Sequence, residues 1–240
     1  QYHPPAGPGN TSPPRFAFIY PDCGENLPLQ SANPSGSLAF IHSAQPSQGA
    51  ENARYIQAKD TGDFLYRCCE LAKEEGIQWL VFTRPLAVHS PQLVDEIQSL
   101  DETTQCVYWD EDQVTAGGRR MKPFFKPAWS PELWLSLDIL DTFALRTGCF
   151  SQALPQPSLA HLKAWVAGTQ KPVHIARVLT YFKPATPVEN RSRFDQHAQC
   201  VSLYLDNLGA RDIQVQPEDD GVLKATWAVK VEKVSIIIPT

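Results

Sequence analysis

Apolar runs alternate with helical patterns in the first half of the chain, and this alternation limits the fold more than any other feature. Residues 64–75 place apolar side chains at helical spacing after Asp60, a favourable N-cap residue. The continuous apolar run at 79–82 is typical of a buried strand. A second helix is expected at 90–100, and the next strand at 106–109. Strand, helix and strand in this order predict an α/β fold with a mostly parallel sheet flanked by helices.

Further elements are expected on both sides of this unit. Strands are predicted at 15–20, 37–42, 141–146 and 172–182, and a short helix at 158–166. A longer helix is expected at 193–208, ending at Gly209. Its predicted apolar face consists of Phe194, Ala198, Val201, Leu205 and Leu208. Residues 211–232 are β-prone, whereas residues 1–14 are rich in Pro and Gly and predict a disordered tail or linker.

Composition excludes several classes of protein. The 240 residues are 42% hydrophobic, which suffices for a sizeable core. The net charge of −5 argues against a general nucleic-acid binder, which would carry a basic stripe. No apolar run reaches the length of about 18 residues that a transmembrane helix needs. The six cysteines form no C-x-x-C pair, which predicts reduced thiols in a cytoplasmic protein.

The stretch at 108–140 combines charged, aromatic and turn-forming residues. This mixture predicts a loop held against a sheet edge, where charged and stacking groups face a ligand. In order, the stretch contains an acidic triplet (110–112), a glycine turn (117–118), Arg119, Arg120, the segment Pro-Phe-Phe-Lys-Pro (123–127) and Trp129.

The same stretch resembles the segment YSDEDK…DGRR…P-FKPDWSPDLLLS of bacterial family-2 glycosyltransferases of surface-polysaccharide assembly. The resemblance extends over about residues 64–240 and implies a GT-A-like, Rossmann-like α/β fold in an incomplete or degenerate copy. The matching residues are Tyr108, Asp110, Glu111, Asp112, Gly118, Arg119, Arg120, Pro123, Phe125, Lys126, Pro127, Trp129, Ser130, Pro131, Glu132, Leu133, Leu135 and Ser136.

The resemblance also implies an order of domains. Residues 15–185 would form a degenerate glycosyltransferase domain, and residues 186–232 a helix and β-prone connection. Residues 233–240, which include VSIIIPT, resemble the first strand of a following, truncated glycosyltransferase domain. That following domain of the same chain is therefore an expected partner.

The chemistry of such enzymes needs carboxylates that this chain lacks at the matching places. A GT-A enzyme holds Mg²⁺ or Mn²⁺ with paired acids and uses a carboxylate base. The metal motif of the family follows the strand matched by 79–82, but residues 83–91 contain no acid. The segment matched to the base, 157–160, has none either. The resemblance thus implies a pseudoenzyme domain with no catalytic residue and no cofactor of its own.

Several residues remain candidates for ligand binding. Arg84 would replace the lost cation by pairing with a diphosphate, although a lone loop arginine is usually solvated. Asp110 and Asp112 would either bond loop amides and the Arg119–Arg120 pair, or chelate Mg²⁺ or Mn²⁺ in an active inverting transferase. The substrate-binding candidates are Asp110, Asp112, Arg119, Arg120, Lys126 and Trp129.

Two functions are therefore expected to compete. The first is a scaffold or acceptor-binding module of a hexosyl- or rhamnosyl-type transferase that makes O-antigen or capsule. The second is an active, metal-dependent transferase that uses a nucleotide sugar. In both cases the expected location is cytoplasmic, or peripheral at the inner membrane through the parent protein, with no nucleic-acid partner.

Overall fold

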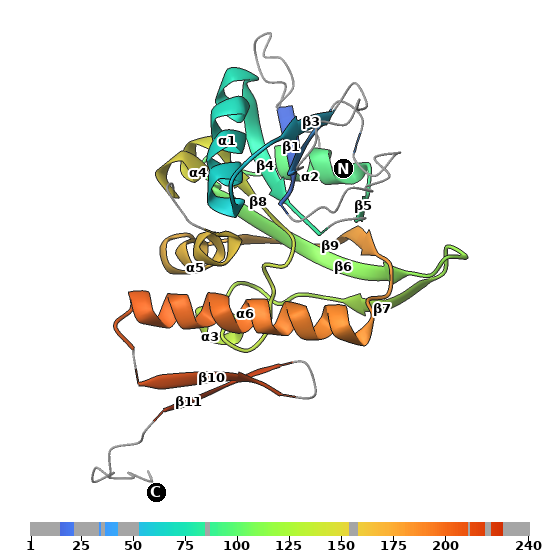
Figure 1. The fold of residues 1–240 in the computed structure, drawn as a ribbon. Helices are drawn as coiled ribbons and strands as arrows, with labels where there is room; N and C mark the ends of the chain where they lie inside the picture. Colours follow the sequence, from blue (N-terminus) through green and yellow to red (C-terminus); the bar gives the residue numbers. More distant parts are fainter. Residues whose placement is uncertain are drawn as a thin grey trace, which may run out of the picture.

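The computed structural model describes a nine-stranded mixed sheet with helices on both faces, together with a separate two-stranded sheet (Figure 1). The α/β fold expected from the alternating pattern is confirmed. The residues described are 15–21, 34, 37–42, 53–84, 87–153, 158–210, 212–218 and 222–227.

The large sheet has the strand order β3-β2-β1-β4-β8-β6-β9-β5, and β7 pairs with β6 at one end. Its strands are β1 (Arg15–Tyr20), β2 (Leu38–His42), β3 (Ala53–Ile56), β4 (Ile77–Phe82), β5 (Val88–His89), β6 (Cys106–Val114), β7 (Arg120–Phe124), β8 (Phe143–Arg146) and β9 (Val173–Phe182). The small sheet pairs β10 (Ile213–Pro217) with β11 (Leu223–Trp227).

Strand direction brings several carboxyl ends to one edge of the large sheet. Strands β1 to β4 run parallel to one another, and β6 runs parallel to β9. Strand β8 is antiparallel to both β4 and β6, so β4 and β6 share a direction. The carboxyl ends of β1, β4 and β9 therefore face the same side, as does the start of β8. In open α/β sheets this is the edge where ligands bind.

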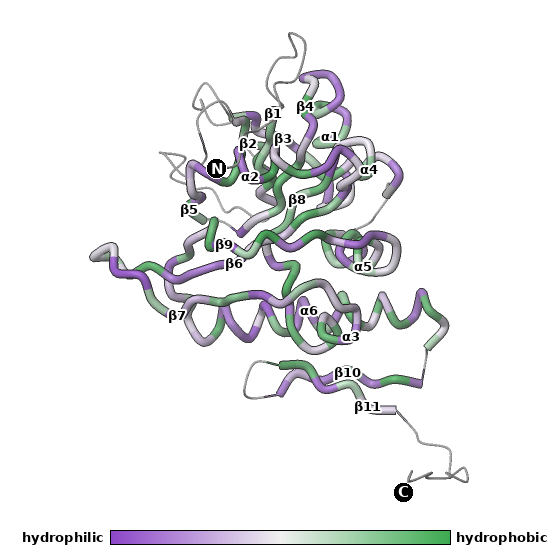
Figure 2. The backbone as a smooth tube through the Cα atoms, turned by 180° about the vertical axis from the view of Figure 1, so that it is seen from behind, coloured by the Kyte–Doolittle hydropathy of each residue, from purple (hydrophilic) through white to green (hydrophobic). Residues whose placement is uncertain are grey.

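The two faces of the sheet carry separate cores. One face packs against α1 (Thr61–Glu74), α4 (Thr147–Ala153), α5 (Leu159–Thr169), α6 (Pro187–Asn207) and the short α3 (Pro131–Trp134). The other face packs against α2 (Gln92–Gln98), where Phe16, Trp79 and Trp109 are buried. In Figure 2 hydrophobic segments coincide with the central strands. Residues 79–82 are all buried, which agrees with the prediction that they lie inside the sheet.

Helix α6 is longer than the sequence predicts. It begins at Pro187 because Thr186 and Glu189 form a capping box, with the Thr186 hydroxyl accepting from the Glu189 amide. It ends before Gly209, whose φ of 76° fits the predicted helix end. Its predicted apolar face is partly wrong, because Leu208 is exposed and Phe194 only half-buried. The buried residues are instead His197, Cys200, Val201, Tyr204 and Leu205.

The stretch at 108–140 is a loop only in part, at residues 115–119, 125–130 and 135–140. Strand β6 continues through the acidic triplet to Val114 and turns back at Gly118, whose φ is 78°, into β7. In Figure 1 this hairpin reaches beyond the edge of the sheet. The prediction of a loop was wrong for the acidic triplet, because each acid has a partner that allows it to lie inside the sheet.

Some predictions fall outside the described residues, namely the tail at 1–14 and the strand at 233–240. Five of the six cysteines lie in the described part of the chain, and all five are buried free thiols: Cys68, Cys69, Cys106, Cys149 and Cys200. Among the described helices, none combines the length and apolar character needed to span a membrane.

Candidate functional site

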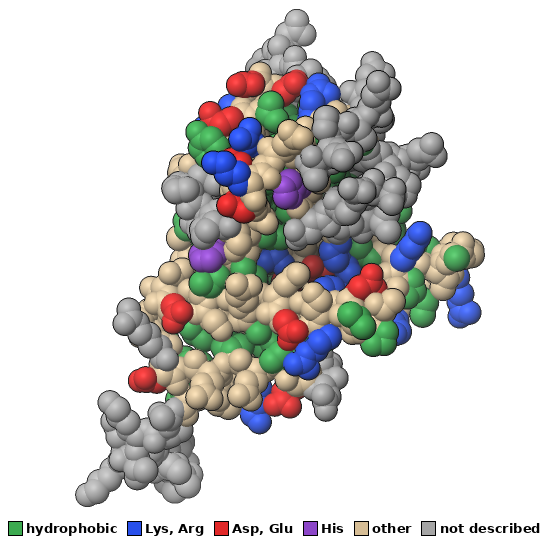
Figure 3. Space-filling view, viewed as in Figure 1, with side chains coloured by type: hydrophobic (Ala, Val, Ile, Leu, Met, Phe, Trp, Pro, Cys, Tyr) green, Lys and Arg blue, Asp and Glu red, His purple; other side chains and the backbone are tan. Residues whose placement is uncertain are grey.

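A cleft of about 720 Å³ lies at the carboxyl ends of β1, β4 and β9. Pro21, Thr83 and Lys183 follow these strands directly, and the segment before β8 adds Asp141. The start of α5 and the first half of α6 close the other side with residues such as Lys163 and Arg193. We call this space the strand-end cleft. Figure 3 shows basic and acidic side chains meeting in the recess beside α6.

Asp110 is held by two donors from other elements. One of its carboxylate oxygens accepts from the backbone amide of Lys126 at 2.8 Å and lies 2.8 Å from Nε2 of His174 on β9. The His174 ring stacks on Tyr108, and the Tyr108 hydroxyl donates to the carbonyl of Pro127 at 2.6 Å. Asp110 is therefore buried in a network that also fixes the segment after β7.

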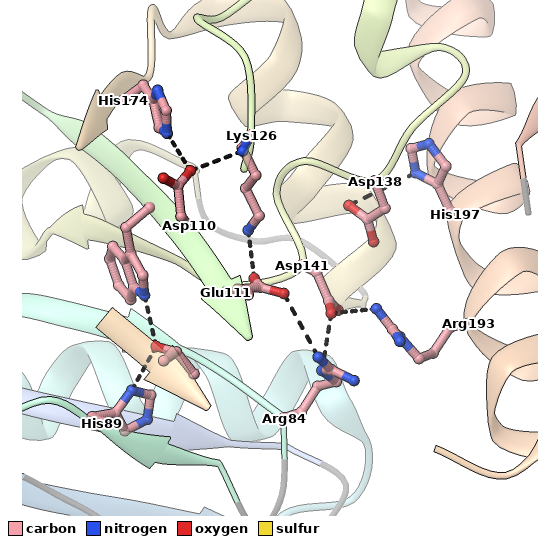
Figure 4. Close-up of polar contacts among 12 residues, drawn as sticks. Arg84, His89, Asp110, Glu111, Lys126, Asp138, Asp141, His174, Arg193 and His197 are labelled. Carbon is pink, nitrogen blue, oxygen red and sulfur yellow. Dashed lines mark hydrogen bonds and ion pairs between the residues drawn. The ribbon is translucent and has the colours of Figure 1, made fainter. Parts of the chain in front are cut away.

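Glu111 bonds two cations. Its Oε1 accepts from Nζ of Lys126, whose side chain is completely buried. Its Oε2 lies 3.6 Å from the Arg84 guanidinium. A buried carboxylate requires such partners, because an unpaired charge costs several kcal/mol away from water. The position of Lys126 thus explains how the middle acid of the triplet can lie within the sheet (Figure 4).

Asp112 pairs with the cation that the sequence analysis proposed as its structural partner. Its Oδ2 accepts from Nε of Arg120 at 2.6 Å, and its Oδ1 from the Gln113 amide at 2.7 Å. The hydrogen bond that Arg120 donates to Asp112 raises the pKa of Arg120. Arg119, like Arg120, is exposed, and it lies on the hairpin turn.

The Arg84 side chain is held by other groups and not solvated, so the interpretation of a solvated arginine was wrong. Its side chain is 22% exposed, and its guanidinium carbon lies 3.3 Å from the centre of the Phe182 ring. Its Nε lies 2.9 Å from Oδ2 of Asp141, as an ion pair without hydrogen-bond geometry. Pairing of β4 with β8 sets Phe82 opposite Phe143, and continuing that register by two residues brings Arg84 opposite Asp141.

The rest of the charge network comes from helices that the sequence analysis did not connect to the site. Arg193 of α6 donates to Oδ2 of Asp141 at 2.6 Å, and Lys163 of α5 donates to Asp138 at 2.9 Å. Burial opposes ionisation of Asp141, but Arg84, Arg193 and Lys163 hold its pKa well below the ordinary value. Burial likewise disfavours the charged form of Lys163, yet Asp138 and Asp141 raise its pKa. These groups therefore stay charged in the folded protein.

Trp129 is half-buried rather than presented to a ligand. Its ring contacts Tyr108 and Trp134 at centroid distances of 6.4 Å each. The aromatic residue beside the triplet that is most open to solvent is Phe125, which is 68% exposed.

The residues present do not fit a divalent metal. In the part of the chain that the structure describes, no group of three or more His, Cys, Asp or Glu side chains is placed to hold a metal ion. Lys126 and Arg120 already donate to the carboxylates of the triplet, His174 lies 2.8 Å from Asp110, and Arg84 forms an ion pair with Glu111. A metal at Asp112 would have to compete with Arg120, and both contacts of Asp110 use Oδ1, which leaves it Oδ2 for a further ligand.

Comparisons with known proteins give only distant structural likenesses. The model is similar to glucosyl-3-phosphoglycerate synthase from Mycobacterium tuberculosis in complex with Mg²⁺ and uridine diphosphate (12% identity, TM-score 0.48, 90% of this chain and 87% of that chain). It is also similar to S. aureus TarS 1–349 (10%, 0.46, 80% and 72%). A third similar structure is a glycosyltransferase involved in glycosylation of the major capsid of PBCV-1 (7%, 0.34, 75% and 98%).

No protein-family model matches the sequence, and no curated protein is similar enough to count as a relative. The low identities and TM-scores of the structural likenesses leave the family of this chain open.

Proposed function

We propose that this chain is a glycosyltransferase-type domain that does not carry out metal-dependent sugar transfer and serves as a scaffold or acceptor-binding module. The observation that carries the proposal is the neutralised acidic triplet. Lys126 and Arg84 bond Glu111, His174 bonds Asp110, and Arg120 bonds Asp112. Because each carboxylate already faces a basic side chain, the triplet offers less negative charge to Mg²⁺ or Mn²⁺ than the free acids of a metal site do.

The wider setting of this module follows from the sequence resemblance alone. The module would precede a second glycosyltransferase domain of the same chain, which would perform the transfer. The parent protein would build a surface polysaccharide such as O-antigen or capsule from nucleotide sugars. It would act in the cytoplasm or at the inner membrane.

The alternative is an active inverting transferase in which Asp110 and Asp112 bind the metal. The spacing of two residues between these acids on one strand favours it, since GT-A enzymes hold their cation with paired acids. For this to occur, Arg120 would have to release Asp112 when the metal binds, and Asp110 would bind through Oδ2 or lose its contacts at Oδ1.

Metal-dependent binding separates the two functions. We would titrate the folded protein with UDP-, GDP- and dTDP-sugars by calorimetry, with and without Mn²⁺, and count bound Mn²⁺ by electron paramagnetic resonance. The proposal expects no bound Mn²⁺ and identical titrations in both conditions. Asp110→Asn and Asp112→Asn should then leave the titrations unchanged, as should the control Asp206→Asn on the exposed end of α6.

The opposite result would be micromolar binding that needs Mn²⁺ and disappears in Asp110→Asn and Asp112→Asn but not in Asp206→Asn. That outcome would replace the proposal by the active enzyme. Circular dichroism of each variant would confirm that the loss concerns binding rather than folding.

A further inference from the structure

The strand-end cleft has the size and walls of a small-molecule site. Its volume of about 720 Å³ falls within the range of roughly 300–1,000 Å³ that ligand pockets occupy. Phe82, Phe143, Phe182 and Leu159 supply apolar lining, and the charged groups lie among them. Such a cleft suits a ligand that combines a ring with a charged group.

The charges around the cleft sum to an excess of positive charge. The cleft is lined by Arg84, Lys163, Lys183 and Arg193 and by two carboxylates, those of Asp141 and Glu189. Behind the lining, Glu111 faces Arg84, Asp138 bonds Lys163, and Lys126 bonds Glu111. Counting both layers, five cations stand against four carboxylates, so an anionic ligand would balance the site.

Two arginines share one acceptor in the cleft. The guanidiniums of Arg84 and Arg193 both approach Oδ2 of Asp141, at 2.9 and 2.6 Å. Each guanidinium carries five N–H donors, many more than one carboxylate oxygen can accept. In the described residues, Nε of Arg84 and Nε of Arg193 are buried without a hydrogen-bond partner.

Thr83 adds a third unsatisfied group. It is only 7% exposed and lines the cleft, yet within the described part of the chain its hydroxyl has no hydrogen-bond partner. Buried polar groups are nearly always bonded, so an unbonded hydroxyl in the wall of a cleft marks a group whose bonding a ligand would complete on reaching it. This observation is independent of the charge count.

We propose that the strand-end cleft binds the phosphoryl group of a small organic phosphate without a divalent cation, anchored by Arg84, Arg193 and Thr83. A phosphoryl group offers several oxygens to the unused guanidinium donors, and arginine binds such groups through paired hydrogen bonds. The apolar walls would hold the organic part. The inference deepens the proposed function by naming a ligand class, but it rests on the cleft and not on the acidic triplet.

Calorimetry in EDTA tests this proposal with three probes: uridine diphosphate, inorganic pyrophosphate and uridine. Uridine diphosphate should bind, pyrophosphate should bind more weakly because it cannot use the apolar walls, and uridine should not bind. A stronger pyrophosphate signal would show that the site takes free phosphates, which would overturn the organic part of the proposal.

Matched variants assign the binding to the named groups. Arg193→Gln should weaken uridine diphosphate binding by about tenfold or more, since it removes a charged donor. Thr83→Val should weaken it by about two- to tenfold. Because the Thr83 hydroxyl has no hydrogen-bond partner among the described residues, this variant should keep or gain stability, which separates binding from folding. Arg177→Gln, which removes an exposed arginine paired with Glu96, serves as the control.

The proposal fails if the folded protein does not bind uridine diphosphate in EDTA at millimolar concentration. It fails equally if Arg193→Gln and Thr83→Val bind as well as the control does. These failures would leave the metal-independent module standing. Binding that requires Mn²⁺ and is lost in the Asp110 and Asp112 variants would instead overturn the proposed function as well, so the two results can be told apart.

Discussion

A single lysine allows two acids of the triplet to lie inside the sheet. Nζ of Lys126 bonds Glu111 while its backbone amide bonds Asp110, and its side chain is completely buried. A buried ion pair is weak evidence of net stabilisation, but removing one partner leaves an uncompensated charge in the interior. Asp110, Glu111 and Lys126 are therefore one unit, although Lys126 lies 15 positions after Glu111 in the sequence.

Lys126→Met tests this dependence. The variant keeps the length of the side chain but leaves Glu111 with Arg84 alone, so we expect a loss of about 3–5 kcal/mol in the free energy of unfolding. Urea denaturation would measure it. Lys224→Met, which breaks the exposed pair with Glu218, should cause no measurable change. Equal stability of Lys126→Met and the wild-type protein would show that the pair contributes nothing.

At the site, the sequence identifies residues better than it identifies their partners. Arg120 was named as a partner of Asp112, and the structure agrees. The roles of His174, Asp141 and Arg193 were missed, because they depend on strand register and helix placement that no local pattern carries. The contact between Arg84 and Asp141 was accessible in principle, since it follows from pairing the predicted strands at 79–82 and 141–146 in antiparallel register.

At the scale of elements, apolar runs and helix caps predicted the fold correctly, whereas the start of a polar helix was predicted wrongly. The strands at 79–82 and 106–109 were found because continuous apolar residues have few alternatives. The first turns of α6 were missed because residues 187–192 are mostly polar and exposed. The sequence does contain a signal for the helix start, however. A helix begins where a threonine such as Thr186 is followed three residues later by a glutamate, and where a proline such as Pro187 takes the first helical position.

Thr186→Ala measures what this cap contributes. It removes the hydroxyl that accepts from the Glu189 amide, so we expect a loss of about 1 kcal/mol in the free energy of unfolding. The control, Ser202→Ala, lies at an exposed position inside the same helix and should be neutral or slightly stabilising. Similar losses in both variants would mean that the cap is not responsible.

At the scale of the whole molecule, buried charges join α6 and α5 to the sheet, and a buried histidine lies on each side of the sheet, His197 on α6 and His89 on β5. His197 of α6 lies against Trp134, and burial lowers its pKa despite the attraction of Asp138. Burial also lowers the pKa of His89 to about 3, where its ring bonds the Thr180 hydroxyl at 2.9 Å. Both histidines are therefore neutral in the folded protein at pH values where the unfolded chain begins to protonate them.

This difference predicts a loss of stability in mild acid. An unfolded histidine has a pKa of about 6.5, so below that pH the unfolded chain binds protons that the folded chain refuses. Each such histidine lowers the free energy of unfolding by up to about 1.4 kcal/mol per pH unit. The lowered pKa values of Asp138 and Asp141 stabilise the folded protein, and this stabilisation is lost only as the pH falls through about 4 and below. The histidine and aspartate effects on stability therefore occur in separate pH ranges.

Urea denaturation at pH 7.5, 6.5, 5.5 and 5.0 would therefore show stability falling between about pH 6.5 and 5. His89→Gln and His197→Gln should each make this decline shallower, because each removes one group that only the unfolded chain can protonate. A flat profile over this range in the wild-type protein, or an unchanged slope in both variants, would mean that these histidines accept protons within the fold.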